Sequence, residues 1–163
     1  MNRNNIRRVS RGYHYFFVKP GRNGNLHKAV ARLMGIRNLV AFRIGGLESG
    51  IYHFNFDKFS LELLLKANLK KHEHEIVSPF VDNPAGAIIL TSVISRSEVK
   101  YGWKSYPYSL IEAGHIGQNI ALTCEKFGIG SCPVGGFVND TVSELLDLTE
   151  DEIPLYVIGF GSI

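Results

Sequence analysis

The chain has 163 residues, of which 45% are hydrophobic and 20% charged, so it can bury the core of one domain. Its net charge of +3 is compatible with an anionic ligand but gives no reason to expect nucleic acid, and no apolar run approaches the ~20 residues that span a bilayer. Cys124 and Cys132 are too few for a disulfide framework, and no signal-type apolar stretch follows the N-terminal charges, so we expect a reduced, cytoplasmic protein.

The first residues are basic. The stretch "IRRVSRGY" (6–13) contains Arg7, Arg8 and Arg11, and on a helix Arg7 and Arg11 would share a face and could both bind phosphate oxygens. A solvated terminus is the more common meaning of such a segment, ahead of a nucleic-acid-binding arm. Apolar residues at helical spacing then predict a helix over 26–34 that ends at Gly35.

Several later segments have strand patterns. "AGAIILTSVI" (85–94) is continuous and rich in β-branched residues, which is typical of a strand buried on both faces. Two apolar runs on either side of a short Asp-Lys break, 50–56 and 59–65, predict a β-hairpin. Further strands are expected over 38–44 and 154–161, and a loop or exposed turn over the polar 66–75.

The longest predicted helix covers 107–127. Gly128 suits the position just after its end, and Lys126 lies near the negative end of its dipole. Small and apolar residues at three- and four-residue steps predict one packed stripe, formed by Leu110, Ala113, Gly114, Gly117, Ile120, Ala121, Cys124 and Phe127. The two glycines in it would let this face pack closely, either on the strand 85–94 or on a second subunit.

A short helix is predicted over 141–148, with Asn139 or Asp140 as its cap. Helices and strands alternate irregularly rather than in βαβ units, so the fold class that the pattern favours is α+β.

Four motifs could carry chemistry. "HEHE" (72–75) has histidines two residues apart, but no third ligand cluster stands out, so we expect a solvated loop and no metal. Cys132 could be a nucleophile with His115 upstream, yet nothing in the sequence orients the two. A small buried cysteine and a core histidine are therefore favoured.

The third motif, "FGIGSCPVGGF" (127–137), fits neither a dinucleotide fingerprint nor a phosphate loop. It indicates either a Gly-rich connection between a helix and a strand or a backbone ledge against a flat ligand.

"KYG" (100–102) directly follows the buried strand 85–94. A lysine beside a tyrosine is most often surface, but in a desolvated pocket Lys100 would lose proton affinity and could act as a base.

Taken together, these segments resemble the nitroreductase-like flavin enzymes, and most closely the azoline dehydrogenases of the streptolysin-S biosynthesis type (SagB-type). The resemblance rests on "KYG…YPYSLIEAGHIGQNIALTCEKFGIGSCPVGGF" followed by "PLYVIGFG", and on "GGLESGIYHFN" before them. It implies an α+β fold with an antiparallel sheet packed with helices, in an intertwined homodimer that holds FMN at the subunit interface. It also implies oxidation of thiazoline or oxazoline rings of a ribosomally made peptide to azoles, next to a cyclodehydratase-type partner, with no nucleic acid or membrane involved.

The resemblance assigns roles to individual residues. Lys100 and Tyr101 match the pair that removes the ring proton, as the catalytic residues. Pro133, Val134, Gly135 and Gly136 match the segment along the flavin ring. Arg7, Arg8 and Arg11 lie at the family's phosphate clamp, where Val9 stands in place of a serine.

The interval between residues 13 and 45 is shorter than in that family. We therefore expect one nitroreductase-like domain over 1–163, incomplete on its N-terminal side. Two alternatives remain: a non-catalytic subunit of a peptide-modifying complex, and a general NAD(P)H-dependent flavin nitroreductase.

Overall fold

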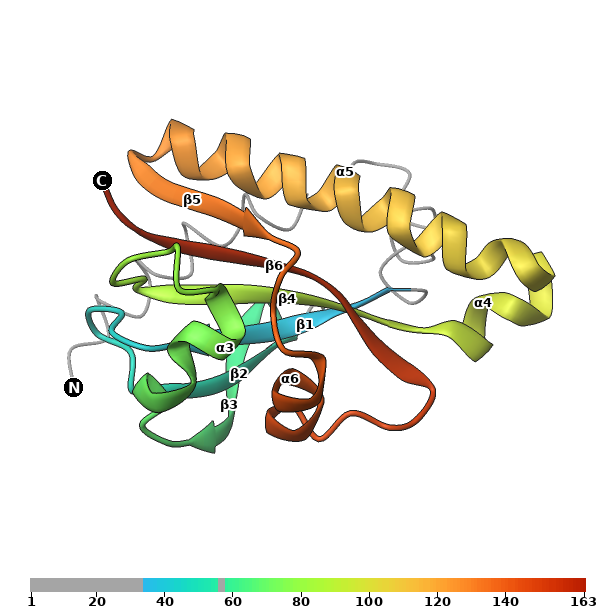
Figure 1. Cartoon of the computed structure of the whole chain (residues 1–163), viewed down its shortest axis with the longest axis horizontal. Coiled ribbons are helices and arrows are strands. Elements are labelled where there is room, and N and C mark those ends of the chain that lie inside the picture. The colour runs from blue at the N-terminus through green and yellow to red at the C-terminus, as the bar shows by residue number, and fades with distance from the viewer. Residues whose placement is uncertain (1–33, 56–57) are drawn as a thin grey trace.

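One antiparallel sheet organises the part of the chain that the computed structural model describes, residues 34–55 and 58–163 (Figure 1). Its six strands lie in the order β3-β2-β1-β4-β6-β5. Their bounds are β1 Met34–Ala41, β2 Gly50–Asn55, β3 Ser60–Lys66, β4 Gly86–Val93, β5 Ile129–Val134 and β6 Glu152–Ser162. This arrangement confirms the α+β class and the antiparallel sheet.

β4 is the central strand, paired with β1 on one side and β6 on the other. Every residue from Gly86 to Ser92 is buried, which confirms the strand expected over 85–94. Glycine is required at its start, because a β carbon at Gly86 would lie 2.7 Å from the carbonyl oxygen of Val40. The continuous apolar pattern thus arises because helices cover both faces of the sheet here.

The hairpin and the last strand are also confirmed. β2 pairs with β3, with a register shift between Ile51 and Tyr52. The strand expected over 38–44 ends earlier, at Ala41, because the N–H groups of Phe42 and Arg43 both donate to the carbonyl oxygen of Ala85 and turn the chain.

The helix predicted over 26–34 lies outside the described residues except for Met34. Met34 opens β1 instead, where it pairs with Ser92 of β4.

Four α-helices are described: α3 Glu73–Val77, α4 Ile94–Tyr101, α5 Ser105–Lys126 and α6 Asn139–Leu145. Two 3-10 turns accompany them, η1 Lys70–His72 before α3 and η2 Gly102–Lys104 before α5.

The expectation of a loop or exposed turn over 66–75 was wrong from Lys70 on, where a 3-10 turn and a short helix form because Ile76 and Val77 are fully buried. Within it Glu73 is buried and accepts a hydrogen bond from the guanidinium of Arg43, so "HEHE" is not a wholly solvated segment.

α5 confirms the predicted long helix, although it begins two residues earlier than predicted. It ends just before Gly128, whose φ of 64° favours glycine. The predicted stripe was partly wrong, since Leu110, Gly114 and Phe127 are exposed. The stripe is confirmed at Ala113, Gly117, Ile120 and Cys124, and it continues at Ser109 and Ser105, which were not predicted to be buried. Small residues occupy this face because α5 packs closely on β5 and β6.

Residues 129–134 were expected to lie within a connection or ledge, but they form β5, which pairs with β6 along its whole length. The start of α6 also differs from the prediction. Val138, not Asn139 or Asp140, is the residue before the first turn, and it makes no side-chain cap.

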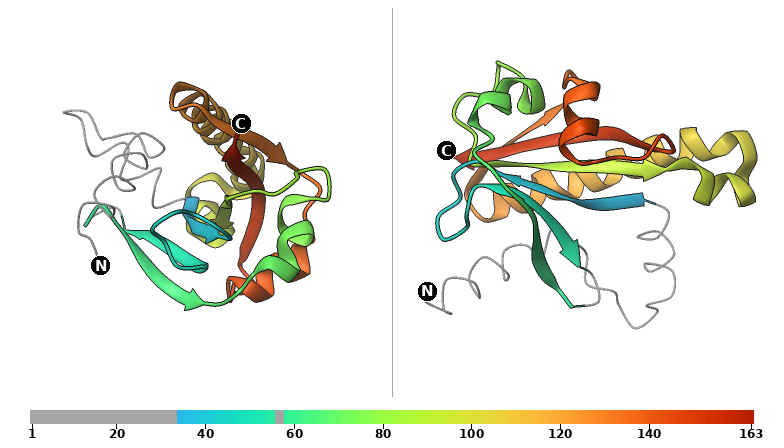
Figure 2. Two further views of the ribbon diagram at one scale, coloured as in Figure 1. Left: turned by 90° about the vertical axis from the view of Figure 1, so that its left-hand side faces the viewer. Right: turned by 90° about the horizontal axis from the view of Figure 1, so that it is seen from below.

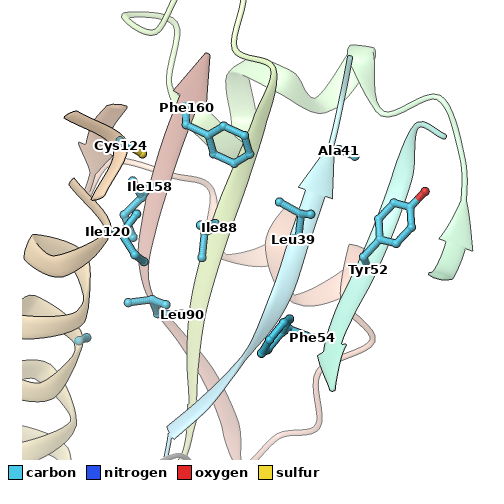
Figure 3. Close-up of a cluster of buried hydrophobic side chains, with 11 residues drawn as sticks. Leu39, Ala41, Tyr52, Phe54, Ile88, Leu90, Ile120, Cys124, Ile158 and Phe160 are labelled. Carbon is cyan, nitrogen blue, oxygen red and sulfur yellow. The ribbon is translucent and has the colours of Figure 1, made fainter. Parts of the chain in front are cut away.

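Helices lie on both faces of the sheet (Figure 2), and a cluster of buried side chains lies under them on each face. Under α5, Ile120 and Cys124 pack with Ile158 and Leu90, as Figure 3 shows. On the opposite face α3 and α6 contribute Ile76, Val77 and Val142. None of the helices in the described residues is both long and apolar enough to cross a membrane.

Candidate active site

Lys100 and Tyr101 form the last turn of α4, at the end of the molecule where the chain leaves β4 (Figure 1). The sequence placed "KYG" directly after a strand, but a helix intervenes. The Nζ atom of Lys100 lies 5.0 Å from the centre of the Tyr101 ring. The two side chains are therefore in cation–π contact, with the lysine exposed and the tyrosine half-buried.

Contacts at both ends position α4. At its start, the backbone N–H of Ser95 donates to Oδ1 of Asp151 over 3.1 Å, and the N–H of Ile94 donates to the carbonyl oxygen of the same residue. At its end Gly102 adopts a φ of 53°, which favours glycine, and its N–H donates to the carbonyl oxygen of Glu98. This turn leads through η2 into α5.

Pro133, Val134, Gly135 and Gly136 form a backbone ledge at the end of β5. Val134 is buried in the core under α6, and this anchors the ledge. Pro133 and both glycines are exposed, and a β carbon built on either glycine would meet no heavy atom within 4 Å. Apart from hydrogen bonds within the sheet, the N–H groups of the two glycines make no backbone hydrogen bond to the described residues. The ledge can thus lie against a flat ligand and offer it N–H donors.

Within one chain the Lys100–Tyr101 pair and the ledge are apart. α4 packs against α5 and η2, whereas β5 packs against α5 and β6. α5 has 22 residues and so extends over about 33 Å. Figure 1 shows α4 near the start of α5 and β5 beginning at its other end. No atom of Lys100 or Tyr101 comes within 4 Å of a β carbon built on the ledge glycines.

The remaining candidates have different outcomes. Arg7, Arg8 and Arg11 lie outside the described residues, so the phosphate clamp stays a prediction. His115 and Cys132 are both exposed, so the expectation of a core histidine and a buried cysteine was wrong. Their elements explain this: His115 lies on the outward face of α5, and Cys132 lies on the edge strand β5.

The histidine-rich segment makes a local side-chain contact rather than a ligand set. The Nδ1 atom of His72 lies 2.8 Å from Oε2 of Glu75, and this contact holds the pKa of that carboxyl below its usual value. In the described ranges, no three His, Cys, Asp or Glu side chains come together as metal ligands.

Tyr108 is a site residue that the sequence did not single out. Its ring meets that of Tyr101 edge to face, with the ring centres 5.4 Å apart and an interplanar angle of 83°. The only signal was an aromatic residue in the first turn of the helix that follows "KYG".

Comparisons with known proteins point to one family. Residues 56–162 match the model of the nitroreductase family. A candidate nitroreductase of Methanocaldococcus jannaschii is 26% identical over 117 residues, which cover 70% of this chain and 59% of that protein. The FMN reductase (NADPH) of Bacillus subtilis is 33% identical over 67 residues, which cover 40% of this chain and 27% of that protein. The chain therefore spans less than two thirds of both relatives, 59% of the first and 27% of the second.

Solved structures share the fold. A chain of the Escherichia coli microcin synthetase McbBCD complex, with truncated pro-MccB17 bound, superposes with a TM-score of 0.81 at 18% identity, covering 97% of this chain and 64% of that one. A candidate nitroreductase of Anabaena variabilis gives a TM-score of 0.77 at 22% identity, covering 93% of this chain and 32% of that one.

Proposed function

Because the chain belongs to the nitroreductase family, whose members are flavin oxidoreductases, we propose that it is an FMN-dependent oxidoreductase that oxidises thiazoline or oxazoline rings of a peptide to azoles. The observation that carries the proposal is the Lys100–Tyr101 pair at the exposed end of α4. A simple hydride relay has no need of a dedicated proton-abstracting pair, whereas aromatisation of an azoline must remove a ring proton as well as a hydride.

The ledge fits a flavin. Gly135 and Gly136 leave their backbone open on the side where a flat ring could lie, and the N–H of Gly136, beyond the end of the β5 ladder, could donate to it. The anchored Val134 gives that backbone a rigid support. When bound, FMN supplies the acceptor for the hydride that leaves the azoline ring.

The Lys100–Tyr101 pair would take the ring proton. Lys100 is exposed in a single chain, and a base of this kind becomes effective when a covering surface removes water from it. Since the pair and the ledge are apart in one chain, we propose that the site forms in a homodimer, with the pair of one protomer beside the ledge of its partner.

The substrate class has independent support. The microcin synthetase complex, one chain of which shares this fold, carries truncated pro-MccB17. This favours a precursor peptide as substrate and a cyclodehydratase-type enzyme as partner. It also favours the azoline reaction over the reduction of small nitro compounds.

The test compares two lysine variants of the full chain, each incubated with FMN and then with a synthetic thiazoline peptide. Lys100→Ala is expected to keep the flavin spectrum and lose azole formation by about 10²–10⁴-fold, the usual contribution of a general base. Lys104→Ala is the matched control. Lys104 is also exposed and its Nζ atom lies 5.6 Å from the centre of an aromatic ring, but that ring is Trp103, and Lys104 is not part of the Lys100–Tyr101 pair. Full azole formation by Lys100→Ala would remove Lys100 from the reaction.

A second candidate is a general flavin nitroreductase, favoured by the likeness to the FMN reductase (NADPH) of Bacillus subtilis. Steady-state turnover of a nitroaromatic compound with NADPH, and none of a thiazoline peptide, would select it. A protein that stays colourless after incubation with FMN, and that purifies with a partner, would instead indicate a non-catalytic subunit of a peptide-modifying complex.

A further inference from the structure

The ring of Tyr108 connects the candidate catalytic pair to the body of the protein. Three groups follow one another at the end of α4: the Lys100 ammonium, the Tyr101 ring and the Tyr108 ring. The ammonium lies 5.0 Å from the centre of the Tyr101 ring, and that ring meets Tyr108 at 5.4 Å, edge to face. Edge-to-face contact is a preferred geometry of aromatic pairs, so it selects one orientation of the Tyr101 ring.

Tyr108 belongs to a rigid part of the molecule. The next residue, Ser109, is buried, and its Oγ atom lies 3.0 Å from Oγ of the buried Ser92 in the central strand β4. Ser105, one turn earlier, is also buried. The first turns of α5 are thereby fixed to the sheet, and Tyr108, a residue that is 40% exposed, projects from them.

The surroundings of the pair are much more open. Val99, just before Lys100, is 94% exposed, and Trp103, just after the pair, is 80% exposed. Tyr101 makes no other aromatic ring contact among the residues that the structure describes. Among the described residues, packing on Tyr108 is therefore the one aromatic contact that can orient the Tyr101 ring.

We propose that Tyr108 is a positioning residue for the Lys100–Tyr101 pair: its ring orients Tyr101, which in turn orients the Lys100 ammonium. This inference rests on the proposed function. Tyr108 acts through its ring and not its hydroxyl, because the contact is between rings. Phenylalanine should therefore replace it, whereas leucine should not.

The first measurement needs neither flavin nor substrate. The full chain is labelled with fluorotyrosine, and the fluorine resonance of Tyr101 is assigned by its loss in Tyr101→Phe. Because a neighbouring ring shifts nearby resonances, Tyr108→Leu is expected to move the Tyr101 signal, and Tyr108→Phe to leave it near its original position. Tyr106→Leu is the control, since Tyr106 has similar exposure on the same helix and no ring contact with Tyr101 among the described residues.

The second measurement follows azole formation with FMN and a synthetic thiazoline peptide. Tyr108→Leu is expected to lower kcat about 10–100-fold with KM unchanged, because a misplaced base affects the transition state more than binding. The kcat of Tyr108→Phe should stay within about twofold of the kcat of the original protein. On this scale a tenfold change in kcat corresponds to about 1.4 kcal/mol.

The two proposals fail in different ways. An unmoved Tyr101 resonance in Tyr108→Leu overturns the positioning role, whatever the activity. Full kcat in Tyr108→Leu, with Lys100→Ala inactive, overturns it as well. Full activity of Lys100→Ala overturns the proposed function instead, and the resonance still shows whether Tyr108 orients Tyr101.

Discussion

Gly117 of α5 lies directly against the ring of Tyr156 in β6, so closely that a β carbon at position 117 would be 2.6 Å from Cε1 of that ring. This contact explains the glycine in the middle of a long helix, where it costs stability in isolation. It also shows that this part of α5 packs on the sheet of its own chain rather than on a second subunit.

The contact predicts opposite effects for two glycines of α5. Gly117→Ala should displace the Tyr156 ring and lower the free energy of unfolding by about 1–3 kcal/mol, as overpacking does. Gly114→Ala should raise it by up to about 1 kcal/mol, because Gly114 has open space around its Cα and alanine favours the helix. Urea unfolding measures both, and equal effects of the two substitutions would contradict this packing.

A side chain on the ledge should block flavin without harming the fold. Gly136→Val introduces a side chain whose β carbon meets nothing in the chain, so unfolding free energy should change by no more than about 0.5 kcal/mol. The dissociation constant for FMN should rise by about tenfold or more, equivalent to about 1.4 kcal/mol. Absorbance between about 350 and 500 nm follows the bound flavin.

Gly45→Val is the matched control for the ledge. Gly45 is equally open in the structure but lies in the turn after β1, away from the ledge. Unchanged FMN affinity in Gly136→Val would place the flavin elsewhere.

The outward face of α5 is expected to form the homodimer interface. Ile111 and Leu122 are 57% and 60% exposed there, with the open Gly114 between them. Ile111→Arg would bury an unpaired charge in such an interface, which costs about 2 kcal/mol or more. Sedimentation should then change from dimer to monomer, while Phe80→Arg, in the 78–85 segment, stays dimeric. A monomeric original protein would refute the two-chain site.

The two cysteines should react at different rates with a thiol reagent. Cys132 is exposed on the edge strand β5 and should react rapidly in the folded protein. Cys124 is fully buried, and burial raises the pKa of its thiol, so it should react only after denaturant opens the core. Cys132→Ser should remove the rapid phase, and a rapid phase that survives this substitution would show that Cys124 is accessible.

Ionisation of Glu112 should lower the free energy of unfolding as pH rises. Partial burial raises the pKa of its carboxyl, against the opposing effect of His115. A carboxyl with a raised pKa in the folded state binds its proton more tightly there than in the unfolded chain, so stability falls as pH rises from about 4.3 through the folded value. Glu112→Gln should therefore be more stable than the original protein at pH 7, with the advantage shrinking below about pH 4. Glu125→Gln, on the exposed side of α5, is the control, and the same pH dependence there would contradict this cause.

Local sequence pattern was sufficient where an element's burial is continuous or strictly periodic. The run 85–94 was predicted to be a strand buried on both faces, and residues 86–93 of it form β4. The spacing of small and apolar residues after Pro107, closed by Gly128, similarly predicted α5 to within two residues at its start. Recognition of the family came from the same stretch, because its motifs occur in order along the chain.

The local sequence pattern was insufficient where the conformation of a segment depends on packing against another segment that is distant in the sequence. The glycine- and proline-containing 129–134 has weak strand propensity, and it becomes β5 because β6 offers it an open edge. α3 forms in a polar segment because the core takes up Ile76 and Val77. In α5, Leu110 is exposed whereas Ser105 and Ser109 are buried. The reason is that close packing of the helix on the sheet requires small side chains on the buried face, even where they are polar.

The sequence by itself thus determined the α+β class, the central strand, the long helix and the candidate residues from Lys100 to Gly136. Only the tertiary structure decided how those residues meet: Lys100 and Tyr101 lie together against Tyr108, whereas the ledge ends β5, a strand that begins at the other end of α5 and packs on α5 and β6 (Figure 1). The reason is that local periodicity reports which side of an element is buried, whereas distances between elements depend on packing across the sheet, which no short window of sequence contains.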